Sequence, residues 1–140
     1  MATDGSVTGT PRVLLRLEGL AMFAGAIAAY ALLGGGWGVF AALFLVPDVA
    51  LLGYLAGPRA GAHVYNAGHS LVGPALLAPF APALAAIWVA HIGFDRALGY
   101  GLKYSSGFAA THLGRIGRHL PRENASTSAI PAAPAVPAAT

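Results

Sequence analysis

The sequence predicts an all-α integral membrane protein: a bundle of four transmembrane helices that run up and down, followed by a disordered tail. Three observations support this fold class. Of the 140 residues, 56% are hydrophobic and only 9% are charged, whereas a soluble domain carries about 25% charged residues. The apolar residues form four runs, each long enough to cross a hydrocarbon core of about 30 Å. The basic residues lie at only one end of these runs.

Composition divides the chain into four parts. Residues 1–11 form a short polar stretch, which we expect to be a flexible tail. Residues 12–104 contain the apolar runs of the transmembrane domain, and residues 105–120 are predicted to be a cytoplasmic or interfacial segment. Residues 121–140 are rich in alanine and proline and too poor in large apolar side chains to fold, so they are expected to be disordered.

The four predicted spans are residues 14–33, 37–56, 60–79 and 83–100. At about 1.5 Å per residue, a helix of this length is about 30 Å long. The connections are short and contain glycine or proline, which is typical of antiparallel neighbours in an up-down bundle. A cleaved signal peptide is the alternative for the first span, but Glu18 within the run argues against it.

Charge placement predicts the orientation. By the positive-inside rule, the end of the bundle that carries the basic residues is cytoplasmic, so both termini of a multi-pass inner-membrane protein lie there. The lipid bilayer is therefore the expected partner, and nucleic acid is not, because the basic residues form no dense patch. A homo-oligomer and a small-molecule or lipid substrate stay open. The basic residues are Arg12, Arg16, Arg59, Arg96, Lys103, Arg115, Arg118 and Arg122.

Three of the spans contain ionisable side chains near their centres. Counting from the span ends places Asp48, His69 and His91 roughly 13–16 Å deep. Asp95 follows His91 by one helical turn and shares its face. An aspartate that faces lipid at this depth costs roughly 2.5–3.5 kcal/mol. We therefore expect the four side chains to face one another inside the bundle.

Imidazole and carboxylate groups suit one divalent ion such as zinc, iron or manganese. The first interpretation is a mononuclear metal site with Asp48, His69, His91 and Asp95 as ligands, in which a bound water starts hydrolysis. Three others stay open: a structural core of interhelical hydrogen bonds, a proton-conducting file that begins at Glu18, and a haem held by the two histidines.

Residues around the cluster receive supporting interpretations. Asn66 and Ser70 share its face of the third span and are expected to orient the ligands. Glu18 is expected to turn inward near the cytoplasmic end, where Arg59 or Arg96 would pair with it. His63 is interpreted as an interfacial residue, and Tyr65 and the other aromatic residues as packing residues.

Several short motifs lie along the spans, each present once: Arg16-Leu-Glu-Gly19, Leu45-Val-Pro-Asp48, Gly53-Tyr-Leu-Ala-Gly-Pro58, Tyr65-Asn66 with His69-Ser70, and His91-Ile-Gly-Phe-Asp-Arg-Ala-Leu-Gly-Tyr-Gly-Leu-Lys103. Together they resemble the domain-of-unknown-function family DUF4260, which consists of small bacterial membrane proteins. The resemblance covers about residues 12–116. It implies a membrane location and a four-helix architecture, and it supplies no reaction.

A looser similarity is to inner-membrane-associated metal-dependent hydrolases, which have a Pro-Asp, a His-Ser and a His-x-x-x-Asp in successive helices. The corresponding residues here are Pro47-Asp48, His69-Ser70 and His91 with Asp95. The further Asp and His that follow the Pro-Asp of that family are replaced by apolar residues, and its His-Arg before Thr-His-Ser is missing. The similarity therefore implies a hydrolase-like site with fewer ligands, which argues against a second metal ion.

Overall fold

The computed structural model describes residues 5–117, which form a mostly helical wedge with a small β-hairpin at its wide end. The tail at 121–140 that was predicted to be disordered lies outside the described residues, as do Arg118 and Arg122. The elements are α1 (Gly9–Leu32), α2 (Trp37–Phe44), the 3-10 helix η1 (Val46–Ala56), α3 (Pro58–His69), α4 (Val72–Leu77), α5 (Pro82–Leu98), β1 (Ala110–Thr111) and β2 (Gly114–Arg115).

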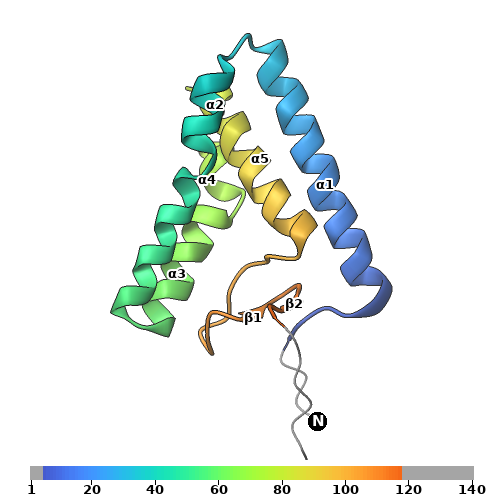
Figure 1. Ribbon diagram of the computed structural model, residues 1–140, viewed down its shortest axis with the longest axis vertical. Helices are drawn as coiled ribbons and strands as arrows, with labels where there is room; N and C mark the ends of the chain where they lie inside the picture. Colours follow the sequence, from blue (N-terminus) through green and yellow to red (C-terminus); the bar gives the residue numbers. More distant parts are fainter. Residues whose placement is uncertain (1–4, 118–140) are drawn as a thin grey trace, which may run out of the picture.

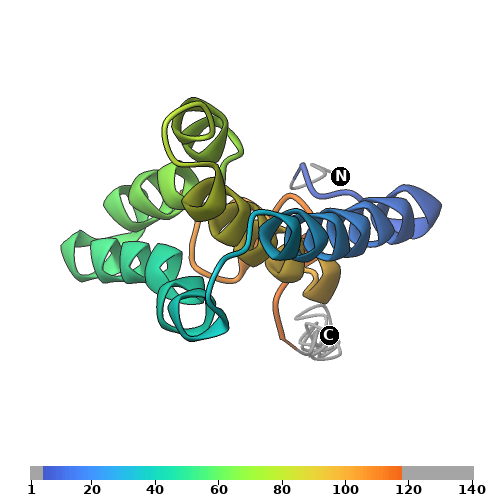
Figure 2. The ribbon, with the colours of Figure 1, turned by 90° about the horizontal axis from the view of Figure 1, so that it is seen from above.

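The chain passes along the wedge four times. In Figure 1, α1 rises from the wide end, α2 and η1 descend, α3 and α4 rise, and α5 descends between them to the hairpin. Seen from above, α3 and η1 lie on one side of α5, and α1 extends on the other side (Figure 2). The mostly helical, alternating arrangement agrees with the prediction.

Two of the four predicted spans are interrupted, and the first of these breaks lies beside Asp48, where Pro47 in the sequence predicts a kink. Residues 37–56 are split into α2 and η1, and residues 60–79 are split after His69, where Ser70 has an extended backbone with ψ 152°. Proline explains both breaks, because it lacks the N–H of a helical bond and its ring clashes with the carbonyl four residues earlier. Pro47 acts in this way on Leu43, and Pro74 on Ser70.

Two stretches are long and apolar enough to cross a membrane: Gly9–Leu32 and Trp37–Ala56. Large apolar side chains are also exposed along all four passages, for example Leu14 on α1, Leu52 on η1 and Leu84 on α5. This exterior is consistent with contact to lipid, because lipid imposes no cost on exposed apolar surface.

Glycines let α1 and α5 approach each other closely. A Cβ built on Gly93 of α5 would lie 2.6 Å from the backbone nitrogen of Phe23 and 2.8 Å from the carbonyl oxygen of Gly19. A Cβ built on Gly19 would in turn lie 2.7 Å from the backbone nitrogen of Ala97. Small residues at such crossings are typical of helix packing in membranes, where close van der Waals contact drives association.

The end of α5 is fixed by its own turn and by α1. Gly99 has φ +96°, and the Tyr100 N–H donates to the carbonyl of Asp95 at 2.8 Å, which is the pattern of a Schellman cap. Arg16 of α1 donates from Nε to the carbonyl of Ala97 at 2.8 Å. The last turn of α5, which carries Asp95, is thereby held against α1.

The segment predicted to be cytoplasmic or interfacial folds back as an antiparallel hairpin, in which Ala110 pairs with Arg115 and Thr111 with Gly114. Leu113, at its turn, is fully buried. The Val7 N–H donates to the carbonyl of His112 at 2.8 Å, so the part of the N-terminal tail next to α1 is bonded to the hairpin. The sequence carries no alternating pattern over these few residues, so the hairpin could not be predicted.

Candidate metal centre

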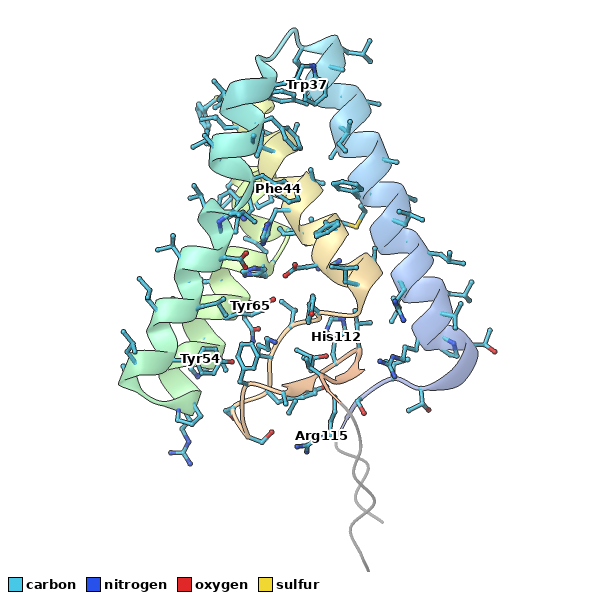
Figure 3. All side chains as sticks on the ribbon, viewed as in Figure 1. Trp37, Phe44, Tyr54, Tyr65, His112 and Arg115 are labelled. Atoms are coloured by element: carbon cyan, nitrogen blue, oxygen red, sulfur yellow. The ribbon has the colours of Figure 1, made fainter. Side chains whose placement is uncertain are left out.

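Three elements bring two imidazoles and two carboxylates to one point. Asp48 lies in the first turn of η1, His69 is the last residue of α3, and His91 and Asp95 lie one turn apart on α5. One donor atom from each of the four lies within 4.8 Å of all the others. Phe44 and Tyr65, which are labelled in Figure 3, pack against the rings of His91 and His69 respectively. The structure therefore brings together all four residues that the sequence singled out as ligands.

The breaks in the two split passages are what present the first two ligands. Asp48 follows Pro47, and its N–H donates to the carbonyl of Leu45 at 3.1 Å as the chain enters η1. His69 precedes the extended residue Ser70, where α3 ends. Non-helical backbone leaves N–H and C=O groups without a helical partner, and here both breaks adjoin the polar cluster.

The separations within the cluster fit the edges of a metal coordination shell. The Nε2 atoms of His69 and His91 are 3.1 Å apart. Asp48 Oδ1 is 3.5 Å from each of these nitrogens. Asp95 Oδ2 is 3.5 Å from Nε2 of His69 and 3.9 Å from Nε2 of His91. Ligand bonds of about 2.0–2.2 Å arranged as a tetrahedron give edges of about 3.4 Å. The five separations that involve a histidine nitrogen lie near this value, whereas the two carboxylate oxygens are bounded only by the 4.8 Å that encloses the whole cluster.

The same distances fit poorly with a purely hydrogen-bonded core. N–H···O bonds have donor–acceptor distances of about 2.7–3.2 Å, and all four of these histidine–aspartate separations are longer. Only the contact between His69 and His91 falls within the range of a hydrogen bond. The carboxylate oxygens lie near both imidazole nitrogens without a hydrogen bond to them, a spacing that four donors around one cation would also give.

The tautomer of His69 follows from its backbone partner. Its Nδ1 lies 2.9 Å from the carbonyl oxygen of Tyr65, and a carbonyl only accepts, so Nδ1 carries the proton in the neutral ring. The lone pair on Nε2 is then directed at the centre of the cluster, as in metal-bound histidines whose other nitrogen donates to a carbonyl. His91 is also buried, and its Nδ1 has no hydrogen-bond partner among the described residues.

Tyr65 is the supporting residue that the sequence interpretation missed. Its hydroxyl donates to Asp95 Oδ2 at 2.9 Å, and its ring stacks on the His69 ring with centroids 3.7 Å apart and planes 9° apart. It thus orients one carboxylate and one imidazole. Its position four residues before His69, on the same helix face, was the available signal, but aromatic residues in apolar helices usually serve packing.

The two residues expected to orient the ligands have other partners. The Asn66 amide donates to the Lys103 carbonyl at 2.9 Å and accepts from the Lys103 N–H at 2.7 Å. The Ser70 hydroxyl lies 3.5 Å from the carbonyl of Ala67. The expectation that they support the cluster is therefore wrong. Asn66 instead ties the segment after α5 to α3.

Lys103 closes the wide end of the site. It is 4% exposed, and its Nζ lies 4.0 Å from the centroid of the Phe108 ring and 4.9 Å from that of Tyr65. Burial lowers the pKa of Lys103 to about 8, so the ammonium form still predominates at neutral pH. Aromatic faces stabilise such a cation. The rings of Phe108 and Tyr65 lie next to the Lys103 ammonium in this way.

The expected ion pair of Glu18 with Arg59 or Arg96 does not form. Every ion pair between described side chains involves His69 or His91. Glu18 and Arg59 are exposed, and Arg96 extends toward Met22, with Nη1 4.0 Å from Sδ. Arg96 therefore lies across α1 at this crossing, whereas Glu18 and Arg59 face outward.

A haem with both histidines as axial ligands does not fit this geometry. Axial nitrogens on opposite sides of an iron would be about 4 Å apart at ligand bonds of about 2.0 Å. The two Nε2 atoms are 3.1 Å apart, which corresponds to adjacent positions on one ion. The cluster is therefore suited to a single bare ion and not to a macrocycle.

We expect Tyr65→Phe to weaken metal binding by about 10–100-fold, the range found when a residue that orients a ligand is removed. The change deletes the hydrogen bond to Asp95 but keeps the ring that stacks on His69. Competition with a coloured chelator measures the affinity. Tyr100→Phe, which removes a hydroxyl outside the cluster, is the control. Equal affinities in the two variants would show that the Tyr65 hydroxyl plays no part.

Comparison with known proteins gives one match. The family described as "Domain of unknown function (DUF4260)" matches residues 12–116, three quarters of the chain. No curated protein and no solved structure matches. The match spans all four ligands of the candidate centre, whereas the looser similarity to metal-dependent hydrolases has no support beyond the motifs themselves.

Proposed function

We propose that this chain, which belongs to the DUF4260 family, is a multi-pass membrane protein that binds one divalent metal ion through Asp48, His69, His91 and Asp95. The observation that carries the proposal is the convergence of these four donors from three separate elements, with nitrogen–nitrogen and nitrogen–oxygen separations near the edges of a tetrahedron. Zinc, iron and manganese all accept this set of nitrogen and oxygen donors.

A hydrolase-like activity is supported by the uneven exposure of the ligands. The Asp48 side chain is 38% exposed, whereas Asp95 is 15% and His69 only 3% exposed. When bound, such an ion lowers the pKa of a coordinated water and so supplies a nucleophile at neutral pH. Four protein donors complete a tetrahedral zinc shell, so the water must enter a fifth position or the place of one carboxylate. Asp48 is the carboxylate on the accessible side.

Metal content tests the proposal. We expect the detergent-purified protein to contain about one zinc, iron or manganese ion per chain, and His69→Ala and His91→Ala to contain none. His63→Ala is the matched control, because His63 is an exposed histidine on the same helix as His69. A native protein without metal, or variants that bind it as before, would leave the cluster as a structural or proton-carrying core.

The membrane orientation is proposed from the charges. Arg12 and Arg16 lie near the start of α1, Arg59 near the start of α3, and Arg96 and Lys103 near the end of α5. The starts of α1 and α3 and the descending end of α5 all face the wide end of the wedge, where the described ends of the chain also lie (Figure 1). The positive-inside rule then places the wide end and both termini in the cytoplasm.

Because the chain has no cysteine, a single introduced thiol reports the orientation. We expect a membrane-impermeant maleimide to label Gly36→Cys, in the α1–α2 turn, in intact bacterial spheroplasts. Ser105→Cys, an exposed position at the wide end, is expected to react only after the membrane is permeabilised. Labelling of both thiols, or only of Ser105→Cys, in intact spheroplasts would contradict the proposed topology.

A further inference from the structure

Lys103 is a buried cation without an ion-pair partner among residues 5–117. It is 4% exposed, and its Nζ atom lies 4.0 Å from the centroid of the Phe108 ring and 4.9 Å from that of the Tyr65 ring. None of the ion pairs between described side chains includes it. A buried charge without a direct partner is costly, so an interaction of longer range is expected to offset part of that cost.

The backbone of Lys103 is fixed from two sides. The Asn66 side chain accepts from the Lys103 N–H at 2.7 Å and donates to its carbonyl at 2.9 Å. Lys103 also pairs with Thr111 of the hairpin in an antiparallel bridge. Asn66 directly follows Tyr65 on α3, so these bonds keep the segment that carries the ammonium beside the Tyr65 ring. The ammonium is therefore held in this place by contacts other than those of its own charge.

Tyr65 joins the ammonium to two of the candidate ligands. The ring that lies 4.9 Å from Nζ also stacks on the His69 ring, with centroids 3.7 Å apart, and its hydroxyl donates to Asp95 Oδ2 at 2.9 Å. Burial lowers the pKa of Lys103, and the negative charge of Asp95 opposes this shift. The ammonium is thus close enough to interact with the charge of the cluster without occupying a ligand position.

The net charge of the cluster depends on whether metal is bound. With neutral imidazoles, the ionised carboxylates of Asp48 and Asp95 give the empty cluster two negative charges, and a divalent ion cancels both. Coulomb energies weaken only as the inverse of distance, and salt screens partly buried charges poorly. The Lys103 ammonium therefore attracts the empty cluster and repels an incoming divalent ion.

We propose that Lys103 is the internal counter-charge of the metal centre: it stabilises the empty cluster and thereby lowers the affinity for the divalent ion, so that the ion can be exchanged. The inference rests on the proposed metal site. Lys103 forms no ion pair with any of the four ligands, so it acts through its charge and not through coordination. It follows α5 at the wide end, the end proposed to face the cytoplasm, from which the exchanging metal would come.

The zinc affinity of charge variants tests the inference, measured in detergent by competition with a coloured chelator. Lys103→Met keeps most of the length and the apolar contacts of the side chain but removes its charge. We expect it to bind zinc at least about tenfold more tightly than the native protein, because charges about 10 Å apart at an effective dielectric constant of about 20 interact by more than this factor. Lys103→Arg, whose guanidinium is always charged, should stay within about threefold of the native affinity.

The sign of the change separates this role from a packing role. A substitution that merely loosened the wide end would weaken zinc binding, because the ligands would be held less well. Arg115→Met, which removes a charge at an exposed position of β2, is the matched control and should leave the affinity unchanged, because solvent screens that charge. Without metal, Lys103→Met should melt at a lower temperature than the native protein, and zinc should narrow the difference.

Unchanged or weaker zinc binding by Lys103→Met, or equally tightened binding by Lys103→Arg, would overturn the inference. If Lys103→Met does not fold, Lys103→Gln removes the same charge, keeps a polar end and carries the same expectation. If the native protein binds about one zinc ion per chain and Lys103→Met binds it no more tightly, the counter-charge is wrong and the metal site stands. If neither the native protein nor any variant binds zinc, the metal site is wrong and the inference with it.

Discussion

Gly93→Ala should lower the free energy of unfolding by about 3 kcal/mol, the upper end of the range for an overpacked core. The added methyl would lie 2.6 Å from the Phe23 nitrogen and 2.8 Å from the Gly19 oxygen. Both atoms belong to the backbone of α1, so no side-chain rotation relieves the clash and the two helices must separate. Circular dichroism during denaturant unfolding in detergent measures the loss.

Gly25→Ala is the matched control, and its expected effect has the opposite sign. Gly25 lies on the same helix as Gly19, and a Cβ built there meets nothing within 4 Å. Alanine is favoured over glycine in a helix by about 0.5–1 kcal/mol, so this variant should be slightly more stable than the native protein. If Gly93→Ala proved as stable as Gly25→Ala, the close crossing of α1 and α5 would be refuted.

We expect Asp48→Asn to destabilise the folded protein when metal is bound and to stabilise it when metal is absent. With metal present at about a hundred times its Kd, binding stabilises the folded protein by about 2.7 kcal/mol. Loss of a ligand removes most of that gain. Without metal, the native cluster holds two carboxylates whose oxygens lie within 4.8 Å of each other, and a partly buried charge without a partner is costly. The neutral amide should then stabilise the protein.

Melting temperatures with zinc and with a chelator measure this reversal. Glu18→Gln is the control for removing a carboxylate, because Glu18 is exposed and lies outside the cluster. Its effect should be small and independent of metal. A destabilisation by Asp48→Asn that is the same with and without zinc would indicate that Asp48 stabilises the fold through protein contacts alone and is not a metal ligand.

The four candidate ligands could be found from the sequence because depth along a helix depends only on residue count. Asp48, His69 and His91 were placed at one level by counting from the span ends, and the structure brings them together with Asp95. The count was accurate enough although both split passages contain a break, because a few residues of altered rise move a side chain by only a few ångströms.

The residues around the cluster were predicted less well, because their roles depend on rotation about the helix axis and on distant segments. Tyr65 and Asn66 are adjacent on α3, yet the first bonds Asp95 and the second bonds Lys103. Which of the two faced the cluster depended on how α3 packs against η1, where Gly53 and Gly61 allow close contact with Val64 and Tyr54.

By itself, the sequence determined that the chain is helical and apolar, that it runs up and down four times, and that its acidic and imidazole groups lie at one depth. These properties follow from local sums of hydropathy, charge and helical rise. Only the tertiary structure decided that the third passage ends its first helix at His69, that Tyr65 orients the cluster, and that a hairpin and Lys103 close the wide end of the site. The reason is physical: these features depend on which backbones can touch, and the glycine contacts that permit it join residues far apart in the chain.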